Sequence, residues 1–221
     1  MPQPRPELFD PAYWQTIGHC DGSAVGRGWV TFVRGGPRDE PWALRHYRRG
    51  GFAAKVVKDA YLWMGLAASR PWREFLLTNE LYAKGLPVPR PVAAHVQRRG
   101  LVYTGDLVTA RIAPADTLAD LLARAPLHAA HWSALGKMLR QFHEAGVRHD
   151  DINARNILVD DQHKFWLIDF DKAALLPSGP WQAQNLARFQ RSLEKFKAAG
   201  GAFHYGDAEW QALKEGYSHA R

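Results

Sequence analysis

The sequence contains a single cysteine, Cys20, among its 221 residues. No internal disulfide can therefore form, which fits a reducing compartment. No apolar run approaches the roughly 18 residues that a membrane-spanning helix needs. The start of the chain, residues 1–6, is rich in proline and lacks the apolar core of a signal peptide. We therefore expect neither a spanning helix nor a signal peptide, and the absence of internal repeats excludes a repeat architecture.

The chain also has no excess of acidic residues, because its formal net charge is +7. Residues 1–100 contain 15 Lys and Arg against 8 Asp and Glu, whereas residues 101–221 contain 14 of each. A basic first half indicates an anionic partner, such as a nucleotide, an acidic lipid or a nucleic acid, although a solvated basic surface gives the same count. No aromatic-rich nucleic-acid-binding motif accompanies the charge, so no nucleic-acid partner is expected.

Apolar residues make up 46% of the chain, which is enough for one compact unit or two small lobes. In the first part, the spacing of apolar residues predicts strands over 28–33 and 42–47, helices over 54–68 and 73–83, and a hairpin over 91–96 and 100–104. In the second part it predicts helices over 117–124, 128–145 and 181–198, and a hairpin over 157–159 and 165–168. This order predicts an α+β fold with an N-terminal part, 1–108, a C-terminal part, 109–221, and a linker near 106–114.

The strongest functional signal is the run His149-Asp150-Asp151-Ile152-Asn153-Ala154-Arg155-Asn156, which is followed by Asp169 after the predicted hairpin. Phosphoryl transfer needs a carboxylate near the attacking hydroxyl and oxygen ligands for the Mg²⁺ that bridges the phosphates. Asp151 fits the carboxylate role, and Asn156 and Asp169 fit metal ligation. Any one of these residues alone is more often a solvated loop residue, but their joint spacing resembles the kinase pattern H-R-D-L-x-x-x-N followed by D-F-G.

The first half contains matching parts. The glycines of Gly26-Arg27-Gly28 allow backbone N–H groups to approach phosphates, although such a pair alone usually marks only a turn. The run Trp42-Ala43-Leu44-Arg45 stands where kinases have V-A-I-K, so Arg45 takes the place of the phosphate-contacting lysine. Arginine holds phosphate bidentately, but it is not interchangeable with lysine. Glu74 is the candidate ion-pair partner of Arg45, and Glu80 is its competitor.

Together these motifs resemble the 3-deoxy-D-manno-octulosonic acid (Kdo) kinases, within the wider group of lipopolysaccharide core kinases. The resemblance spans residues 24–195 and includes segments 44–51, 85–89, 149–156, 166–171, 185–188 and 191–193. The run Arg45-His46-Tyr47-Arg48-Arg49-Gly50-Gly51 discriminates best, because generic kinases lack it. The resemblance implies a two-lobed protein-kinase-like fold, with a small antiparallel-sheet N-lobe that carries a helix and a reduced helical C-lobe.

The resemblance also implies an activity and its participants. The implied reaction is ATP-dependent transfer to the 4-hydroxyl of Kdo on Kdo-lipid IVA, a lipid A precursor, by a peripheral protein at the cytoplasmic face of the bacterial inner membrane. Asp151 takes the catalytic-base position, and Asn156 and Asp169 take the Mg²⁺ positions. The residues implied at the nucleotide are Gly26, Gly28, Arg45 and Glu74.

The basic run offers candidate residues for an anionic acceptor. His46, Arg48 and Arg49 are the candidates for its carboxylates and phosphates, or for an anionic leaflet. Solvated arginines at the end of a strand are the alternative interpretation. Most of the nine tryptophans are expected in the core, and the candidates for a membrane interface are Trp14, Trp63 and Trp72.

The departures from the protein-kinase pattern argue against a protein substrate. Asp150 replaces the arginine of H-R-D, Asp171 replaces the glycine of D-F-G, and no A-P-E follows. Two alternatives stay open. One is a related kinase with a heptose or aminoglycoside acceptor, of which the basic run disfavours the aminoglycoside. The other is a nucleotide-binding pseudokinase or membrane-associated adaptor. No obligate protein partner is indicated.

Overall fold

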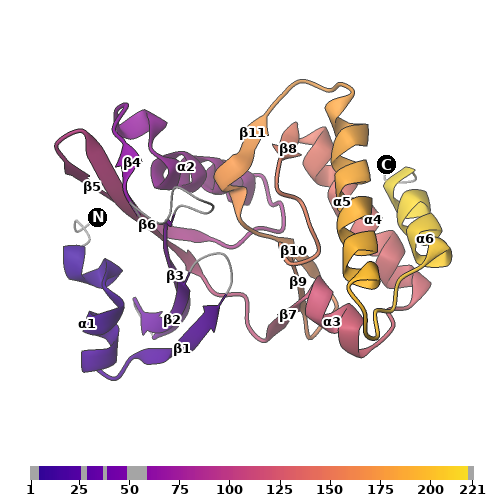
Figure 1. Cartoon of the computed structure of the whole chain (residues 1–221), viewed down its shortest axis with the longest axis horizontal. Helices are drawn as coiled ribbons and strands as arrows, with labels where there is room; N and C mark the ends of the chain where they lie inside the picture. The colour runs from indigo at the N-terminus through magenta and orange to yellow at the C-terminus, as the bar shows by residue number, and fades with distance from the viewer. Residues whose placement is uncertain (1–4, 26–28, 37–38, 49–58, 219–221) are drawn as a thin grey trace. The chain divides into compact units, whose positions relative to one another are not determined.

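The computed structural model describes residues 5–25, 29–36, 39–48 and 59–218. The chain divides into two compact units, one made of residues 1–82 and 89–111, the other of residues 83–88 and 112–221 (Figure 1). The division between residues 111 and 112 lies within the expected linker, 106–114. Residues 106–110 are nevertheless part of a strand, and residues 83–88 belong to the second unit although they precede the division.

The first unit is built on an antiparallel sheet with the strand order β1-β2-β3-β6-β4, in which β5 also pairs with β6. Its strands are β1 (Cys20–Val25), β2 (Trp29–Gly35), β3 (Glu40–His46), β4 (Tyr61–Leu62), β5 (Pro91–Arg99) and β6 (Val102–Ala110). Its helices are η1 (Pro6–Phe9), α1 (Pro11–Thr16), η3 (Leu66–Ala68) and α2 (Arg70–Ala83).

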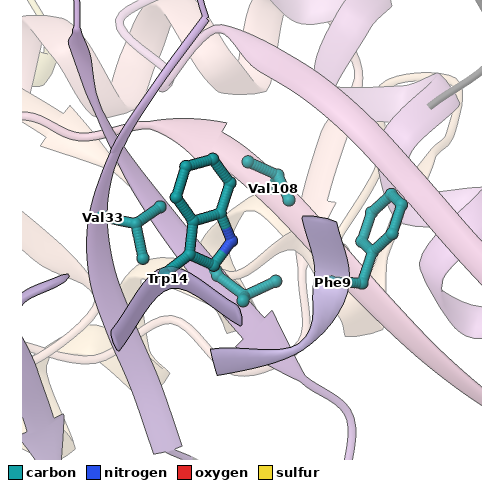
Figure 2. Packing of buried hydrophobic residues seen from close by; sticks show 5 residues of the cluster. Phe9, Trp14, Val33 and Val108 are labelled. Carbon is teal, nitrogen blue, oxygen red and sulfur yellow. The ribbon is translucent and has the colours of Figure 1, made fainter. Parts of the chain in front are cut away.

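Alternate residues of a strand point to opposite faces of a sheet, so one strand supplies side chains to both. Apolar side chains pack on both faces of this sheet. On one face, residues from η1 and α1 pack against the strands in a cluster of Phe9, Trp14, Val33, Leu44 and Val108 (Figure 2). On the other face, Phe75 of α2 packs against a cluster of Tyr47, Tyr61, Tyr103 and Leu107. Trp14 is therefore a core residue and is excluded as a membrane-interface residue.

The second unit is mainly helical, with α3 (Leu118–Arg124), α4 (Ala129–Glu144), α5 (Trp181–Ala198) and α6 (Asp207–Ser218). One small sheet has the order β10-β9-β7, and a second pairs β11 with β8. These strands and the short helix between them are β7 (Ala115–Thr117), β8 (Val147–His149), β9 (Ile157–Asp160), β10 (Phe165–Leu167), η4 (Phe170–Lys172) and β11 (Ala173–Leu175). The predicted α+β class is confirmed, with an antiparallel sheet in the first part and helices in the second.

The predicted helix over 54–68 is wrong where the structure describes it, because residues 61–62 form β4 and only residues 66–68 form a short 3₁₀ helix, η3; residues 54–58 lie outside the described part. The apolar spacing there comes from strand alternation. Tyr61 pairs with Tyr103 and is buried, whereas Leu62 pairs with Val102 and is exposed. Gly65, with a φ of 96°, then turns the chain. Pairing with the edge of β6 therefore overrides the local helical pattern.

Helix α6 was not predicted, and it packs closely along α4. A Cβ atom at Gly136 of α4 would lie 2.0 Å from the carbonyl oxygen of Leu213. A Cβ atom at Gly216 of α6 would lie 2.0 Å from the carbonyl oxygen of Ser133. The two glycines thus let the helix backbones approach one another. Within the described part of the chain, no helix combines the length and apolarity needed to cross a membrane.

We expect Gly136→Ala to lower the free energy of unfolding by about 1–3 kcal/mol, because the added methyl overpacks the contact between α4 and α6. Urea unfolding measures the change. Lys137→Ala, at the exposed next position of α4, is the matched control and should change stability little. Alanine normally favours a helix over glycine by about 1 kcal/mol. A more stable Gly136→Ala protein would therefore contradict the close approach.

Candidate active site

The loop after β8 carries Asp151 and is anchored by its buried apolar residues. His149 pairs with Ala173 of β11, and the Asp150 N–H donates to the Lys172 carbonyl at 3.2 Å. Ile152 and Ala154 are 2% and 0% exposed. Because these two side chains are buried in the second unit, the loop between β8 and β9 is fixed to its core. We call this loop, together with His149 at the end of β8, the catalytic loop (residues 149–156), after the role proposed below for Asp151.

The catalytic loop closes on the backbone of Asp151. The side-chain amides of Asn153 and Asn156 both donate to the Asp151 carbonyl oxygen, at 2.7 and 2.8 Å. The Asn153 amide oxygen in turn accepts the Arg155 N–H at 2.9 Å. With its carbonyl oxygen held by two hydrogen bonds, Asp151 has a fixed backbone. Asn153, to which sequence reasoning gave no role, is therefore a positioning residue of this loop.

The structure brings Asn156 and the residue before Asp169 together. The Ile168 N–H donates to the Asn156 carbonyl at 3.0 Å, so the hairpin of β9 and β10 returns the chain to the catalytic loop. Asp169 follows with a φ of 66° and a ψ of 65°, a left-handed conformation that aspartate tolerates better than most residues. The loop and the turn at Asp169 are thus neighbours.

The residues at this turn fit a magnesium ion. Since the Asn156 amide nitrogen is bound to the Asp151 carbonyl, its amide oxygen remains as a ligand, and Asp169 adds a carboxylate. Mg²⁺ typically takes one or two protein carboxylates and completes its shell with water and phosphate oxygens. Among the described residues, no group of three or more His, Cys, Asp or Glu side chains is placed to hold a metal ion. Asn156 and Asp169 stay the two candidate metal ligands at this turn.

His149 fixes the other side of Ile168. Its Nε2–H donates to the Ile168 carbonyl at 3.1 Å, and its ring meets Phe170 edge to face, with 5.3 Å between centroids. Burial is the main cause that lowers the pKa of His149. The ring is therefore neutral at pH 7 and acts as a buried support, and it is not the group that exchanges protons with substrate.

One face of α5 supports the catalytic loop at three points. The Asn185 amide donates to the His149 carbonyl at 2.8 Å, and the Ser192 hydroxyl accepts the Ala154 N–H at 3.2 Å. Between them, the Arg188 Nη2 atom lies 3.4 Å from the Asp151 Oδ1 atom, and its side chain is 48% exposed. Positions 185, 188 and 192 share a helix face, and this spacing was the sequence signal that could have identified them as functional.

A buried network continues from Asn185 to α6. The His143 Nε2–H donates to the Asn185 amide oxygen at 3.2 Å, and the Tyr217 hydroxyl donates to the His143 Nδ1 atom at 2.7 Å. Burial lowers the pKa of His143 and raises that of Tyr217. A neutral His143 thus connects the last helix to the helix that holds the catalytic loop.

Asp150, which stands in place of the arginine of H-R-D, has a local partner. Its carboxylate forms two contacts with the Arg148 guanidinium, Nε to Oδ1 at 2.8 Å and Nη2 to Oδ2 at 3.0 Å. Both side chains are partly exposed, so this pair contributes little to stability. It neutralises the extra carboxylate next to Asp151.

In the first unit, Arg45 pairs with Glu74 of α2. The Arg45 Nη2 atom and the Tyr47 hydroxyl both donate to the Glu74 Oε2 atom, and Arg45 also donates to the Tyr47 oxygen at 2.9 Å. Glu74 is 4% exposed, while the Arg45 side chain is 22% exposed. Glu74 is therefore the acid at Arg45 that the sequence favoured over Glu80.

His46 lies on the opposite face of the sheet from Arg45. Its Nδ1 atom is 2.6 Å from Asp106 Oδ1, and its Nε2 atom is 3.4 Å from Asp59 Oδ2. The bond to Asp106 is the main cause that raises the pKa of His46. His46, Asp59 and Asp106 line a cavity of about 440 Å³ that lies within the first unit and also includes His95. The structure therefore does not bring His46 and Arg45 to one site.

Of the other basic and glycine residues expected at the site, only Arg48 lies within the described ranges. Arg48 is exposed just after β3. Gly26, Gly28 and Arg49 lie outside the described residues. The expected roles of these last three residues in binding nucleotide and acceptor stay predictions.

The chain is similar to known proteins along nearly its whole length. A family model described as the lipopolysaccharide kinase (Kdo/WaaP) family matches residues 11–217. The 3-deoxy-D-manno-octulosonic acid kinase of Photobacterium profundum is 44% identical over 209 residues, covering 95% of this chain and 87% of the relative. The proteins of the same name from Vibrio vulnificus and Actinobacillus succinogenes are 42% and 37% identical, covering 97% of this chain and 89% and 91% of theirs.

The lowered pKa of His143 predicts a loss of stability in mild acid. An unfolded histidine takes up its proton near pH 6.5 and the buried one only at lower pH, so the free energy of unfolding falls as pH drops below about 6.5. His143→Gln can keep both hydrogen bonds but does not titrate, and should make this fall shallower. Urea unfolding between pH 7.5 and 5.5 measures the slope, with exposed His204→Gln as control. An unchanged slope in His143→Gln would refute the burial argument.

Proposed function

The chain belongs to the lipopolysaccharide kinase (Kdo/WaaP) family, and from this premise we propose that it phosphorylates the 4-hydroxyl of Kdo on Kdo-lipid IVA, with ATP as donor and Mg²⁺ as metal. As a member of this family the chain is a kinase, a transferase that phosphorylates a sugar hydroxyl. The observation that carries the proposal is the loop that holds the Asp151 backbone, carries Asn156 and binds the chain leading to Asp169.

Asp151 accepts the proton of the sugar hydroxyl as the hydroxyl oxygen attacks the γ-phosphorus of ATP. The new bond joins that oxygen to phosphorus, the bond to the β,γ-bridging oxygen breaks, and ADP leaves. When bound, Mg²⁺ would neutralise negative charge on the phosphates. Asn156 and Asp169 would hold it, through the amide oxygen and the carboxylate described above. The fixed backbone of the loop keeps the base in position.

Arg45 contacts the phosphates of ATP in this proposal. Glu74 and Tyr47 hold its guanidinium from one side, so its planar group has a set orientation. An arginine with fixed orientation binds phosphate bidentately, which the lysine of other kinases does not do. The backbone N–H groups at Gly26 and Gly28 are the proposed companions of Arg45 at the phosphates.

Arg188 is the proposed ligand of the acceptor's carboxylate. Kdo is an acid, and a cation beside Asp151 attracts it to the catalytic carboxylate and offsets the repulsion between two anions. Arg188 contacts Asp151 at only 3.4 Å and is half exposed, so its guanidinium can receive a second carboxylate. Arg48 and Arg49 stay in the proposal as cations for acceptor phosphates. His46 is left out of it, because its ring contacts Asp106 and Asp59.

A lipid-linked acceptor locates the reaction at a membrane surface. We place the enzyme at the cytoplasmic face of the inner membrane, as a peripheral protein attracted by anionic lipid. The basic first hundred residues support this placement. The reaction needs neither a nucleic acid nor a protein partner.

Transfer of label from γ-labelled ATP to Kdo-lipid IVA tests the proposal directly, and Asp151→Asn should lower kcat by about a hundredfold or more. The amide keeps the size of the side chain but cannot accept the proton. Asp161→Asn, in the exposed turn between β9 and β10, is the matched control and should keep full activity.

Three outcomes would contradict the proposal or parts of it. Label in a heptose acceptor but not in Kdo-lipid IVA would identify a related sugar kinase. ATP binding without turnover on any acceptor would identify a pseudokinase. An Asp151→Asn protein as active as the Asp161→Asn control would remove the role of base from Asp151.

The role of Arg188 is tested by varying the enzyme and the acceptor together. Arg188→Gln should raise KM for free Kdo by about tenfold or more, since a charge-assisted pair is lost, and should change KM little for the Kdo carboxamide. Lys195→Gln, exposed on the same helix, is the control. A fall in kcat of equal size with both acceptors would show instead that Arg188 acts only by orienting Asp151.

A further inference from the structure

The exposed large apolar side chains of the described residues are concentrated at one place in the first unit. Nine such side chains are exposed in these residues, and five of them lie in or next to β4 and at the tip of the hairpin of β5 and β6. They are Leu62 at 60%, Met64 at 73%, Leu66 at 46%, Leu101 at 78% and Val102 at 37% exposure. We call these five residues the hairpin patch.

Backbone pairing holds the two halves of the hairpin patch together. Leu62 pairs with Val102, and the Trp63 N–H donates to the Leu101 carbonyl at 2.9 Å. Figure 1 shows β4 beside this hairpin at the edge of the sheet. The neighbouring residues Tyr61 and Tyr103 fill the core on the buried face. The exposed side chains are therefore not needed to complete that core.

Two arginines stand beside the hairpin patch without an acidic partner among the described residues. Arg98 and Arg99 are exposed at the end of β5. Arg98 lies over the half-buried Trp63 ring at 5.4 Å and donates to the Gly100 carbonyl at 2.9 Å, and Arg99 donates to the Gln97 side chain at 3.1 Å. Neither contact neutralises a guanidinium. Arg98 and Trp63 lie on the face of Tyr103, and Arg99 lies on the face of Val102, so aliphatic side chains, a tryptophan and positive charge surround the tip of this hairpin.

We propose that the hairpin patch docks the protein on the surface of an anionic phospholipid bilayer. Leucine and methionine side chains enter the boundary between headgroups and acyl chains, Trp63 lies at the level of the headgroups, and Arg98 and Arg99 bind lipid phosphates. The charge of the patch favours this occupant over an apolar protein surface, which would leave two arginines desolvated. The proposal deepens the proposed function and rests on it for the location of the acceptor.

A patch of this size gives reversible attachment. Five aliphatic side chains bury far less apolar surface than a spanning helix, and each arginine near an anionic surface strengthens binding by about fivefold. Binding should therefore weaken with rising salt and with falling content of anionic lipid. Reversible attachment suits an enzyme that must release one lipid-linked product and find the next acceptor.

Sedimentation with vesicles of phosphatidylcholine and phosphatidylglycerol, without nucleotide or acceptor, tests the proposal. The double variant Met64→Asp with Leu101→Asp should bind such vesicles about tenfold or more weakly than the unaltered protein. The double variant Ile17→Asp with Tyr82→Asp makes the same change of charge at two exposed residues outside the patch, and should bind much better. Thermal unfolding of both variants verifies that they fold.

The charge of the patch is tested separately. Arg98→Gln with Arg99→Gln should weaken binding to the mixed vesicles by about 25-fold and should not affect binding to pure phosphatidylcholine. The proposal is overturned if the unaltered protein does not sediment with the mixed vesicles, or if the patch variant and its control lose binding equally. Phosphorylation of Kdo-lipid IVA dispersed in detergent, without vesicles, reports the proposed function independently, so failure of docking and failure of the kinase assignment are distinguishable.

Discussion

The position of Asp169 depends on how the residue before it is held. The N–H of Ile168 is bound to the catalytic loop at Asn156, and its carbonyl is bound to the ring of His149. The ring of His149 is buried, and a hydrogen bond of a buried group is costly to lose. The bond from His149 requires a proton on Nε2, and burial lowers the pKa of the ring and so favours its neutral form. One desolvated histidine thus connects the loop that carries Asp151 to the turn that carries Asp169.

Strand alternation imposes a comparable constraint on the first unit. The basic run from residue 45 to 49 reads as one cluster in the sequence, but a strand sends successive side chains to opposite faces. Arg45 therefore reaches Glu74 of α2, whereas His46 reaches Asp106 on the other face. The density of charge in a sequence overstates what one site receives, because only every second residue of a strand contributes to each face.

Much of the second unit could be predicted because its signals are local. The bounds of α5 match the predicted helix. The spacing from Asp151 to Asp169 predicted that a hairpin brings the chain back to the loop. What could not be predicted depends on contacts between distant residues. The edge pairing of Tyr61 with Tyr103 decides β4 against a helix, and no local pattern encodes it. Asn185 and Arg188 stood in recognised segments, but their partners in the catalytic loop are more than 35 residues away in the chain.

The last helix shows why such contacts matter for catalysis. Gly136 and Gly216 allow α6 to approach α4 closely enough for the Tyr217 hydroxyl to reach His143. His143 then orients the amide of Asn185, and only one orientation lets its nitrogen donate to the His149 carbonyl. The hydrogen bonds thus run without a break from Tyr217 of α6 through His143 and Asn185 to the His149 carbonyl. The packing of α6 therefore bears on the geometry of the candidate active site, although its sequence carries no kinase motif.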